Sequence, residues 1–212
     1  MQVKPTAMTK FSNYIFKNYA KDSSKLLVHV GAGVAVIATS AQVGMLLTDK
    51  KLEQKKKNFL VKQELMINST YLALYYTACE AVRHLVNNTI EKGKILTESC
   101  ALAIANLKND KFIEPTKKWA NIFTKDELKK GISHNLENIE NTDFFKKSAQ
   151  EIQPRIKENS IKALEKFQGF KGGAGVLSVL TTSVIAGNIV GVYLGNVIAT
   201  KMAEKNHRLN VA

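Results

Sequence analysis

The chain has 212 residues, of which 45% are hydrophobic, and its 31 basic and 18 acidic side chains give a net charge of +13. This composition fits a globular or membrane protein better than a disordered chain, because it supplies enough apolar surface for a core or a membrane segment. Lysine accounts for 28 of the basic residues. Lysine offers point charges that suit anionic lipid headgroups, whereas nucleic-acid recognition favours the planar guanidinium, so nucleic acid is a disfavoured partner.

Only two cysteines occur, Cys79 and Cys100, and they form no CxxC pair. This pattern argues against a zinc site and against a disulfide scaffold. A single bridge between the two stays open, but two free thiols are the simpler interpretation.

Residues 1–25 form the first predicted segment. Apolar and aromatic side chains recur there at i, i+3, i+4 and i+8, at Phe11, Tyr14, Ile15 and Tyr19. This spacing predicts an amphipathic helix. Its aromatics and lysines suit the headgroup boundary of a membrane, and packing on the rest of the protein is an equally good interpretation.

Residues 26–48 contain no charged side chain. As a helix they would extend about 34 Å, which exceeds the hydrocarbon core of a bilayer, roughly 30 Å thick. We therefore expect a first transmembrane helix here. A buried helix of a soluble core is one alternative, and a secretory signal cleaved near Thr39 is another.

A dense group of lysines follows directly, at Lys50, Lys51, Lys55, Lys56 and Lys57. Lysines that flank an apolar segment are typical of membrane-surface positions, so we expect these five to contact anionic headgroups. For lysines further along the chain, solvated helix faces explain the charge equally well.

Residues 49–171 are predicted to be a basic, helix-rich region. Its first helix covers residues 60–90 and is uncharged from Met66 to Cys79, but Glu64 and Glu80 bracket that stretch closely. A charge near the bilayer centre costs about 2.5–3.5 kcal/mol even on insertion scales. We therefore expect this helix to be interfacial or packed on protein rather than spanning.

Shorter helices are expected after it, at residues 95–107, after Pro115 with Trp119 on the inner face, and after Thr124. Thr124 and Glu127 stand at the spacing of a capping box. Residues 141–143 predict a break, and a further helix is expected at residues 144–167, kinked or split at Pro154 and ended by the glycine-rich residues 169–175. No window alternates with a period of two, so the predicted class is all-α without a sheet.

Residues 172–200 form the second uncharged block and would extend about 43 Å as a helix, so we expect a second transmembrane helix. Residues 201–212 are then a polar tail. Small residues recur at every fourth position of the block, which predicts a helix–helix interface at Ser183, Gly187, Gly191, Gly195 and Ala199. The glycine content common to membrane helices is the alternative.

The stripe of small residues predicts either self-association or a hairpin within the chain. The first uncharged block offers two poorer stripes that could receive it. One contains Gly31, Ala35 and Thr39, and the other contains Val36, Ser40 and Gly44.

A catalytic site is not predicted. The four histidines His29, His84, His134 and His207 lie on separate segments, without a metal-binding spacing. The glycine-rich residues 169–175 lack the preceding strand and the following Lys-Ser/Thr of a phosphate loop. We therefore expect a non-enzymatic protein with no cofactor-binding and no metal-binding residues.

Residues 40–86 resemble an uncharacterised membrane protein encoded by crAss-like phages of gut Bacteroidales. The resemblance covers less than a quarter of the chain and is carried by Ala41-Gln42-Val43-Gly44, Asp49-Lys50-Lys51, Lys56-Lys57-Asn58-Phe59-Leu60, Gln63-Glu64 and Leu74-Tyr75-Tyr76-Thr77. It implies a phage-encoded helical membrane protein of unassigned role, located in the inner membrane of the bacterial host. It contains no catalytic motif and transfers no site residues.

The leading functional hypothesis is a self-associating membrane protein that organises or perturbs a bilayer. Two alternatives are a membrane-tethered adaptor, whose middle helices bind a partner protein, and a holin-like pore former. The two predicted spans place both termini on one side of the membrane and residues 49–171 on the other, and the lysine distribution favours a cytoplasmic middle region.

Overall fold

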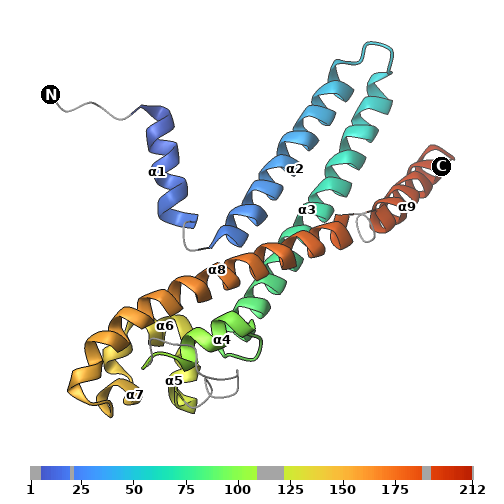
Figure 1. The fold of residues 1–212 in the computed structure, drawn as a ribbon. Helices are drawn as coiled ribbons and strands as arrows, with labels where there is room; N and C mark the ends of the chain where they lie inside the picture. The colour runs from blue at the N-terminus through green and yellow to red at the C-terminus, as the bar shows by residue number, and fades with distance from the viewer. Residues whose placement is uncertain (1–5, 20–21, 109–121, 188–191, 212) are drawn as a thin grey trace. The chain divides into compact units, whose positions relative to one another are not determined.

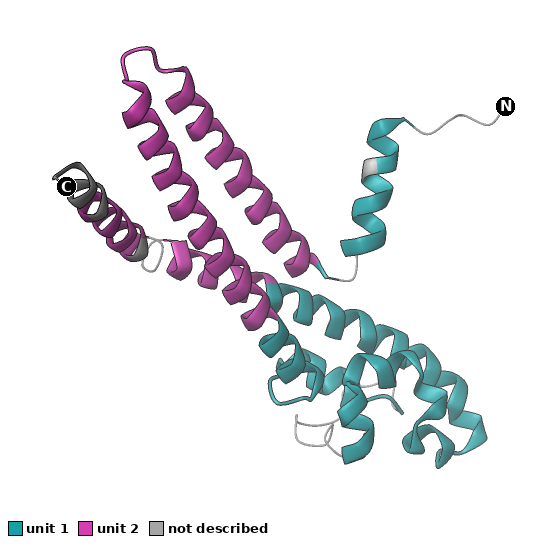
Figure 2. Cartoon of the chain, turned by 180° about the vertical axis from the view of Figure 1, so that it is seen from behind, with its two compact units in different colours: residues 1–22, 84–175 teal, residues 23–83, 176–212 magenta. Residues whose placement is uncertain are grey.

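The computed structural model describes residues 6–19, 22–108, 122–187 and 192–211. Every regular element in these ranges is a helix, which confirms the predicted all-α class for the described part of the chain. The chain divides into two compact units (Figure 2). Unit 1 comprises Met1–Asp22 and His84–Gly175, and unit 2 comprises Ser23–Arg83 and Val176–Ala212.

The helices follow one another as shown in Figure 1. In chain order they are α1 (Ala7–Tyr19), α2 (Ser23–Thr48), α3 (Gln54–Glu91), α4 (Glu98–Ala105), α5 (Lys125–Lys130), α6 (Ile132–Glu137), the 3-10 turn η2 (Ile139–Asn141), α7 (Asp143–Lys146), the 3-10 turn η3 (Gln150–Ile152), α8 (Gln153–Ile185) and α9 (Val192–Val211). The helices α3 and α8 each contribute residues to both units.

Unit 1 has a hydrophobic core of its own. Its largest fully buried side chains come from α3, α4, α6 and α8, namely Ile90, Ile104, Leu136, Ile156 and Phe167. The short helices α4, α5 and α7 each begin at a threonine whose side chain caps the helix, because a helix of one or two turns forms too few internal bonds to be stable alone. The predicted capping box is confirmed: the Thr124 hydroxyl accepts the amide hydrogen of Glu127, and the Glu127 carboxylate accepts that of Thr124.

Unit 2 is built around a helical hairpin. The helices α2 and α3 lie side by side and antiparallel, joined by a turn at residues 49–53 (Figure 1). The Lys57 ammonium donates to the Leu47 carbonyl at 3.3 Å near the turn. Near the other end of the hairpin, His29 and Tyr76 form a side-chain hydrogen bond of 3.2 Å. The pairing of α2 with α3 therefore extends along most of α2.

The predicted boundaries need three revisions. Residues 169–175 do not end a helix, because α8 continues through them from Gln153 to Ile185. The helix predicted at residues 144–167 is instead three elements, α7, η3 and α8, and Pro154 occupies the first turn of α8, where a missing amide hydrogen costs no helical bond. Residues 172–200 do not form one described helix, since α8 ends at Ile185 and α9 begins at Val192.

The other predicted segments can be compared with the described helices one by one. The expected helices at residues 1–25, 26–48, 60–90 and 95–107 correspond to α1, α2, α3 and α4. Pro115 and Trp119 lie outside the described residues, as does Gly191. Unit 2 groups residues 49–83 with α2, whereas the sequence placed them in the middle region.

Candidate functional site

The outer surface of α2 is the first candidate site. Within the described residues, α2 is the one helix long and apolar enough to cross a membrane, and none of its most apolar stretch is buried. Its large outward-facing side chains are Val30, Val34, Val36, Ile37, Met45 and Leu47, each at least half exposed. Such a surface differs from that of a core helix, but a signal sequence near an N-terminus passes the same test of length and composition.

The helices α2 and α3 are in close contact where the α2 backbone meets a tyrosine ring of α3. Gly31 of α2 lies against Tyr75, and a methyl group added to Gly31 would overlap the Tyr75 hydroxyl and lie 2.9 Å from ring carbon Cζ. Tyr75 is 7% exposed and packs with Val28, Cys79 and Val179. Gly31, in one of the two stripes predicted on the first uncharged block, is thus in contact with α3. Gly31 and Ala35 also line a groove together with Ser183 and Gly187 of the second uncharged block.

The predicted stripe itself lies against the same face of α3, because its contacts Ile67 and Tyr71 precede Tyr75 at steps of four residues. Gly187 faces Tyr71, whose hydroxyl would lie 3.1 Å from a Cβ atom added to the glycine, and a Cβ atom added to Gly195 would lie 3.4 Å from Ile67 Cγ2. Ser183 is half-buried, and Ala199 is half-buried on α9. Gly187 and Gly195 therefore accommodate an aromatic and a branched side chain of α3, whereas the sequence had offered only the first uncharged block as a partner within the chain.

A shallow groove of about 410 Å³ lies where α2, α3 and α8 meet within unit 2. Its walls are mostly apolar, and its polar groups are hydroxyls of Tyr71, Tyr75 and Ser183. This lining includes no carboxylate or histidine, so it holds neither of the groups that usually act as a base to activate a serine hydroxyl such as that of Ser183.

The lysine-rich turn is the second candidate site. Lys50, Lys51, Lys55 and Lys56 are exposed, and Lys57 is half-buried through its bond to the Leu47 carbonyl. Asp49 accepts the amide hydrogen of Lys51 at 2.8 Å, which fixes the turn. The five predicted membrane-surface lysines therefore gather at one end of the hairpin.

The third candidate is a half-buried carboxylate in unit 1. Glu91, at the end of α3, accepts hydrogen bonds from the Ser133 amide at 2.9 Å, from the Ser133 hydroxyl at 2.6 Å and from the Lys171 ammonium at 2.7 Å. Burial alone would raise the pKa of the Glu91 carboxyl, but the bonds from Lys171 and Ser133 hold it below its ordinary value of 4.5. With both carboxylate oxygens engaged by protein donors, Glu91 ties three helices together and is poorly placed for proton transfer.

The sequence identified a second structural carboxylate, Glu127, only as part of a capping box. Glu127 closes the capping box of α5 and also accepts the amide hydrogen of Asp143 at 2.8 Å, at the start of α7. Burial raises the pKa of Glu127, and the amides of Thr124 and Asp143 lower it by more. The Thr124 and Thr142 caps are local signals, but the reach from α5 to α7 depends on the tertiary fold.

Groups suited to catalysis are scattered in the described part of the chain. No cluster of three or more His, Cys, Asp or Glu side chains that could hold a metal is present there. Cys79 and Cys100 are free thiols, both buried, and lie in different units. His29 pairs with Tyr76, and His134 is near Asn138 on its own helix.

Comparison of the chain with protein-family models, with curated proteins and with solved structures gives no match.

Proposed function

We propose that the chain is a non-enzymatic, membrane-anchored helical protein, in which α2 holds the chain at a bilayer and unit 1 binds a partner protein. The observation that carries this proposal is the contrast between the two units. The apolar surface of α2 is turned outward, whereas unit 1 buries its apolar side chains in a core of its own. An anchor and a separate binding domain need this division of apolar surface.

The location proposed for the anchor is a bacterial inner membrane, on the basis of the resemblance over residues 40–86. The exposed lysines at the turn support a membrane with anionic headgroups. Two observations favour the adaptor over bilayer perturbation: unit 1 is folded around a core of its own, and Gly187 and Gly195 of the stripe contact α3 of the same chain.

Self-association is the second candidate, and it is supported by a different face of α2. Gly33 and Gly44 are exposed, with no atom within 4 Å of a Cβ position on either. Ile37 and Ser40 lie between them at helical spacing and are exposed as well. This face would let a second copy of α2 approach closely. A holin-like pore would also use such an interface.

Substitution on the outer face of α2 tests the anchor. Ile37 is 71% exposed at the middle of α2, and Ile37→Lys should move the protein from the membrane pellet to the supernatant after alkaline carbonate extraction. Ile161 of α8 in unit 1 is 58% exposed, and Ile161→Lys is the matched control that should remain in the pellet. Wild-type protein in the supernatant, or equal behaviour of the two variants, contradicts the anchor.

Cross-linking through the lysines of unit 1 in intact cells separates the two candidate functions. The adaptor proposal expects cross-links from unit 1 to a different protein. Cross-links only between copies of this chain, lost on Gly44→Leu, would replace it with self-association.

A further inference from the structure

The hairpin contacts bear on how many helices enter the membrane. His29 and Tyr76 stack with ring centroids 5.9 Å apart, and Gly31 lies so close to Tyr75 that any added side chain would overlap it. Lys57 completes the pairing near the turn. A bilayer that takes up α2 alone would have to separate these contacts and expose Tyr75, which is 7% exposed in the hairpin. A bilayer that takes up the intact hairpin keeps them.

The stretch of α3 beside α2 is less apolar than α2, but it contains an uncharged segment. Between Glu64 and Glu80 lie 15 uncharged residues, which as a helix extend about 22 Å. Large apolar side chains point outward along it, at Leu65, Met66 and Leu74, each between 38% and 51% exposed. The hydrocarbon core is roughly 30 Å thick, and lysine stems at the turn end can lie along the remaining apolar depth while their ammonium groups reach water.

The charges that bracket this stretch have partners on α3 itself. Arg83 donates to Glu80 at 2.6 and 3.1 Å, and Arg83 is 6% exposed. Glu64 accepts from the Asn68 amide at 2.8 Å. Glu80 has an opposite charge as its partner, Glu64 accepts a hydrogen bond, and both lie at the ends of the uncharged stretch. Each therefore costs less than the isolated charge at the bilayer centre on which the sequence-based objection to a spanning α3 was based.

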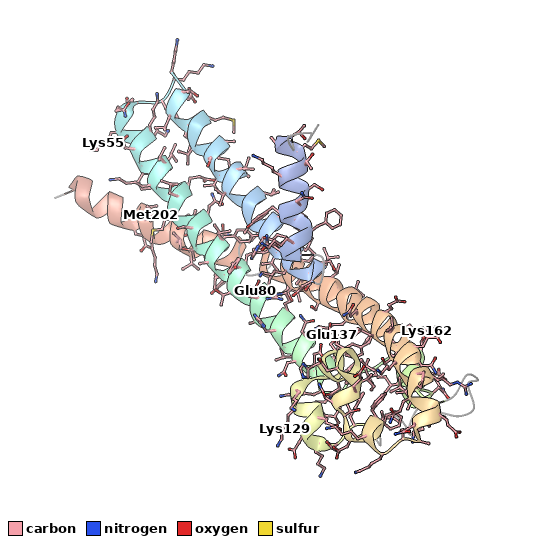
Figure 3. All side chains as sticks on the ribbon, turned by 90° about the vertical axis from the view of Figure 1, so that its left-hand side faces the viewer. Lys55, Glu80, Lys129, Glu137, Lys162 and Met202 are labelled. Atoms are coloured by element: carbon pink, nitrogen blue, oxygen red, sulfur yellow. The ribbon has the colours of Figure 1, made fainter. Side chains whose placement is uncertain are left out.

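We propose that α3 crosses the bilayer beside α2, so that the lysine-rich turn at residues 49–57 meets anionic headgroups on the side opposite to Lys25 and Arg83. Figure 3 shows Lys55 near the turn and Glu80 well along α3 from it. The second spanning segment is then α3, and residues 49–171 do not lie on one side of the membrane. This inference rests on the proposed anchor role of α2.

Charge complementarity identifies the surface that the turn meets. Lys50, Lys51, Lys55 and Lys56 are exposed there. The exposed apolar side chains of α2 end beside them at Leu47, and those of α3 begin at Leu65, after Lys62 and Glu64. Lysines next to an apolar layer match the headgroup zone of an anionic leaflet in both charge and depth. The occupant of the apolar faces is the hydrocarbon of the same bilayer.

Cysteine labelling of the full chain tests the topology. Lys51→Cys places a thiol in the turn, and Lys92→Cys places one directly after α3; both positions are exposed. The native Cys79 and Cys100 are at most 2% exposed, and labelling of the wild type gives the background. With a membrane-impermeant maleimide, one variant should label in intact cells and the other only in inside-out vesicles. Labelling of both from the same side overturns the proposal, while protein in the membrane pellet would leave the anchor role standing.

A charge placed on the outer face of α3 provides an independent test. Ala73 is exposed midway between Glu64 and Glu80. In the Lys51→Cys chain, Ala73→Lys should abolish labelling of position 51 from the side opposite to position 92, because the new lysine would have to enter the hydrocarbon. Asn88→Lys, also at an exposed position of α3, is the matched control and should leave the labelling unchanged. Wild-type labelling with Ala73→Lys would place α3 outside the hydrocarbon and overturn the proposal. Protein absent from the pellet in the wild type would instead refute the anchor itself.

Discussion

Gly131, between α5 and α6, is a position where one added methyl group should strongly destabilise unit 1. Its backbone has φ 99° and ψ 151°, a region almost restricted to glycine, where another residue costs about 1–3 kcal/mol. A Cβ at this position would lie 2.8 Å from Oε2 of Glu91. That oxygen accepts the Ser133 amide hydrogen, and a hydrogen bond to a charged group is worth about 1.5–3 kcal/mol.

Gly131→Ala should therefore cost roughly 2–5 kcal/mol, if part of the hydrogen bond survives the shift of Glu91. A domain of this kind has a free energy of unfolding of about 5–15 kcal/mol, so the loss is a large fraction of it. Hydrogen–deuterium exchange of the slowest amides of unit 1, measured in the full chain, reports the change. Each 1.4 kcal/mol corresponds to about tenfold faster exchange, so at least about 30-fold is expected.

The control is the same substitution in an ordinary helix. Gly173 lies in α8 and has no atom within 4 Å of its Cβ position. Gly173→Ala should stabilise α8 by about 0.5–1 kcal/mol, because alanine loses less backbone entropy on folding. The reasoning is refuted if Gly131→Ala exchanges like the wild type, or if both variants shift in the same direction.

Two further predictions concern the carboxylates of unit 1. Glu91→Gln should destabilise unit 1 by about 1–3 kcal/mol at pH 7. The folded pKa of Glu91 is below 4.5, so the stability that its carboxylate contributes is present above that pH and is lost as the pH falls through the folded pKa. The free energies of unfolding of wild type and variant should therefore converge in acid. A difference between them that does not change with pH contradicts this. Thr124→Ala should cost about 0.5–2 kcal/mol by removing the cap of α5. Glu127→Ala should cost more, because Glu127 also binds the amide that begins α7, and thermal unfolding that gives equal costs would count against this role.

Structural features that depend on residues close together in the chain were predicted correctly from the sequence. The capping box of Thr124 and Glu127 depends on residues three apart, and the helix at α2 depends on one uninterrupted apolar run. Both were predicted and both are present. The end of α2 at Thr48 also follows the change from apolar to charged residues.

Tertiary packing determines the structure at positions where the local sequence predicts something else. Residues 169–175 carry the composition of a helix break, yet α8 continues through them. Phe167 is fully buried in the core of unit 1, and Phe170 and Ala174 pack on the same core at helical spacing. Burial of these side chains outweighs the cost of the intervening glycines, which propensity alone cannot reveal. The bond between Glu91 and Lys171 joins residues 80 apart and has no local signal.

The pairing of α2 with α3 was likewise invisible in the sequence, and it supports a last prediction at Gly31. Gly31→Ala would place a methyl group against the buried Tyr75 ring, and overpacking of this kind costs about 1–3 kcal/mol. Gly33→Ala, two residues further on, meets no atom within 4 Å and should be neutral or slightly stabilising. Because the hydroxyl is the nearest atom, Tyr75→Phe should partly restore the stability lost in Gly31→Ala, and a double-mutant cycle of thermal unfolding in detergent measures this coupling. Additive effects of the two substitutions would mean that Gly31 and Tyr75 do not touch, and the hairpin would then no longer require α3 to follow α2 into the membrane.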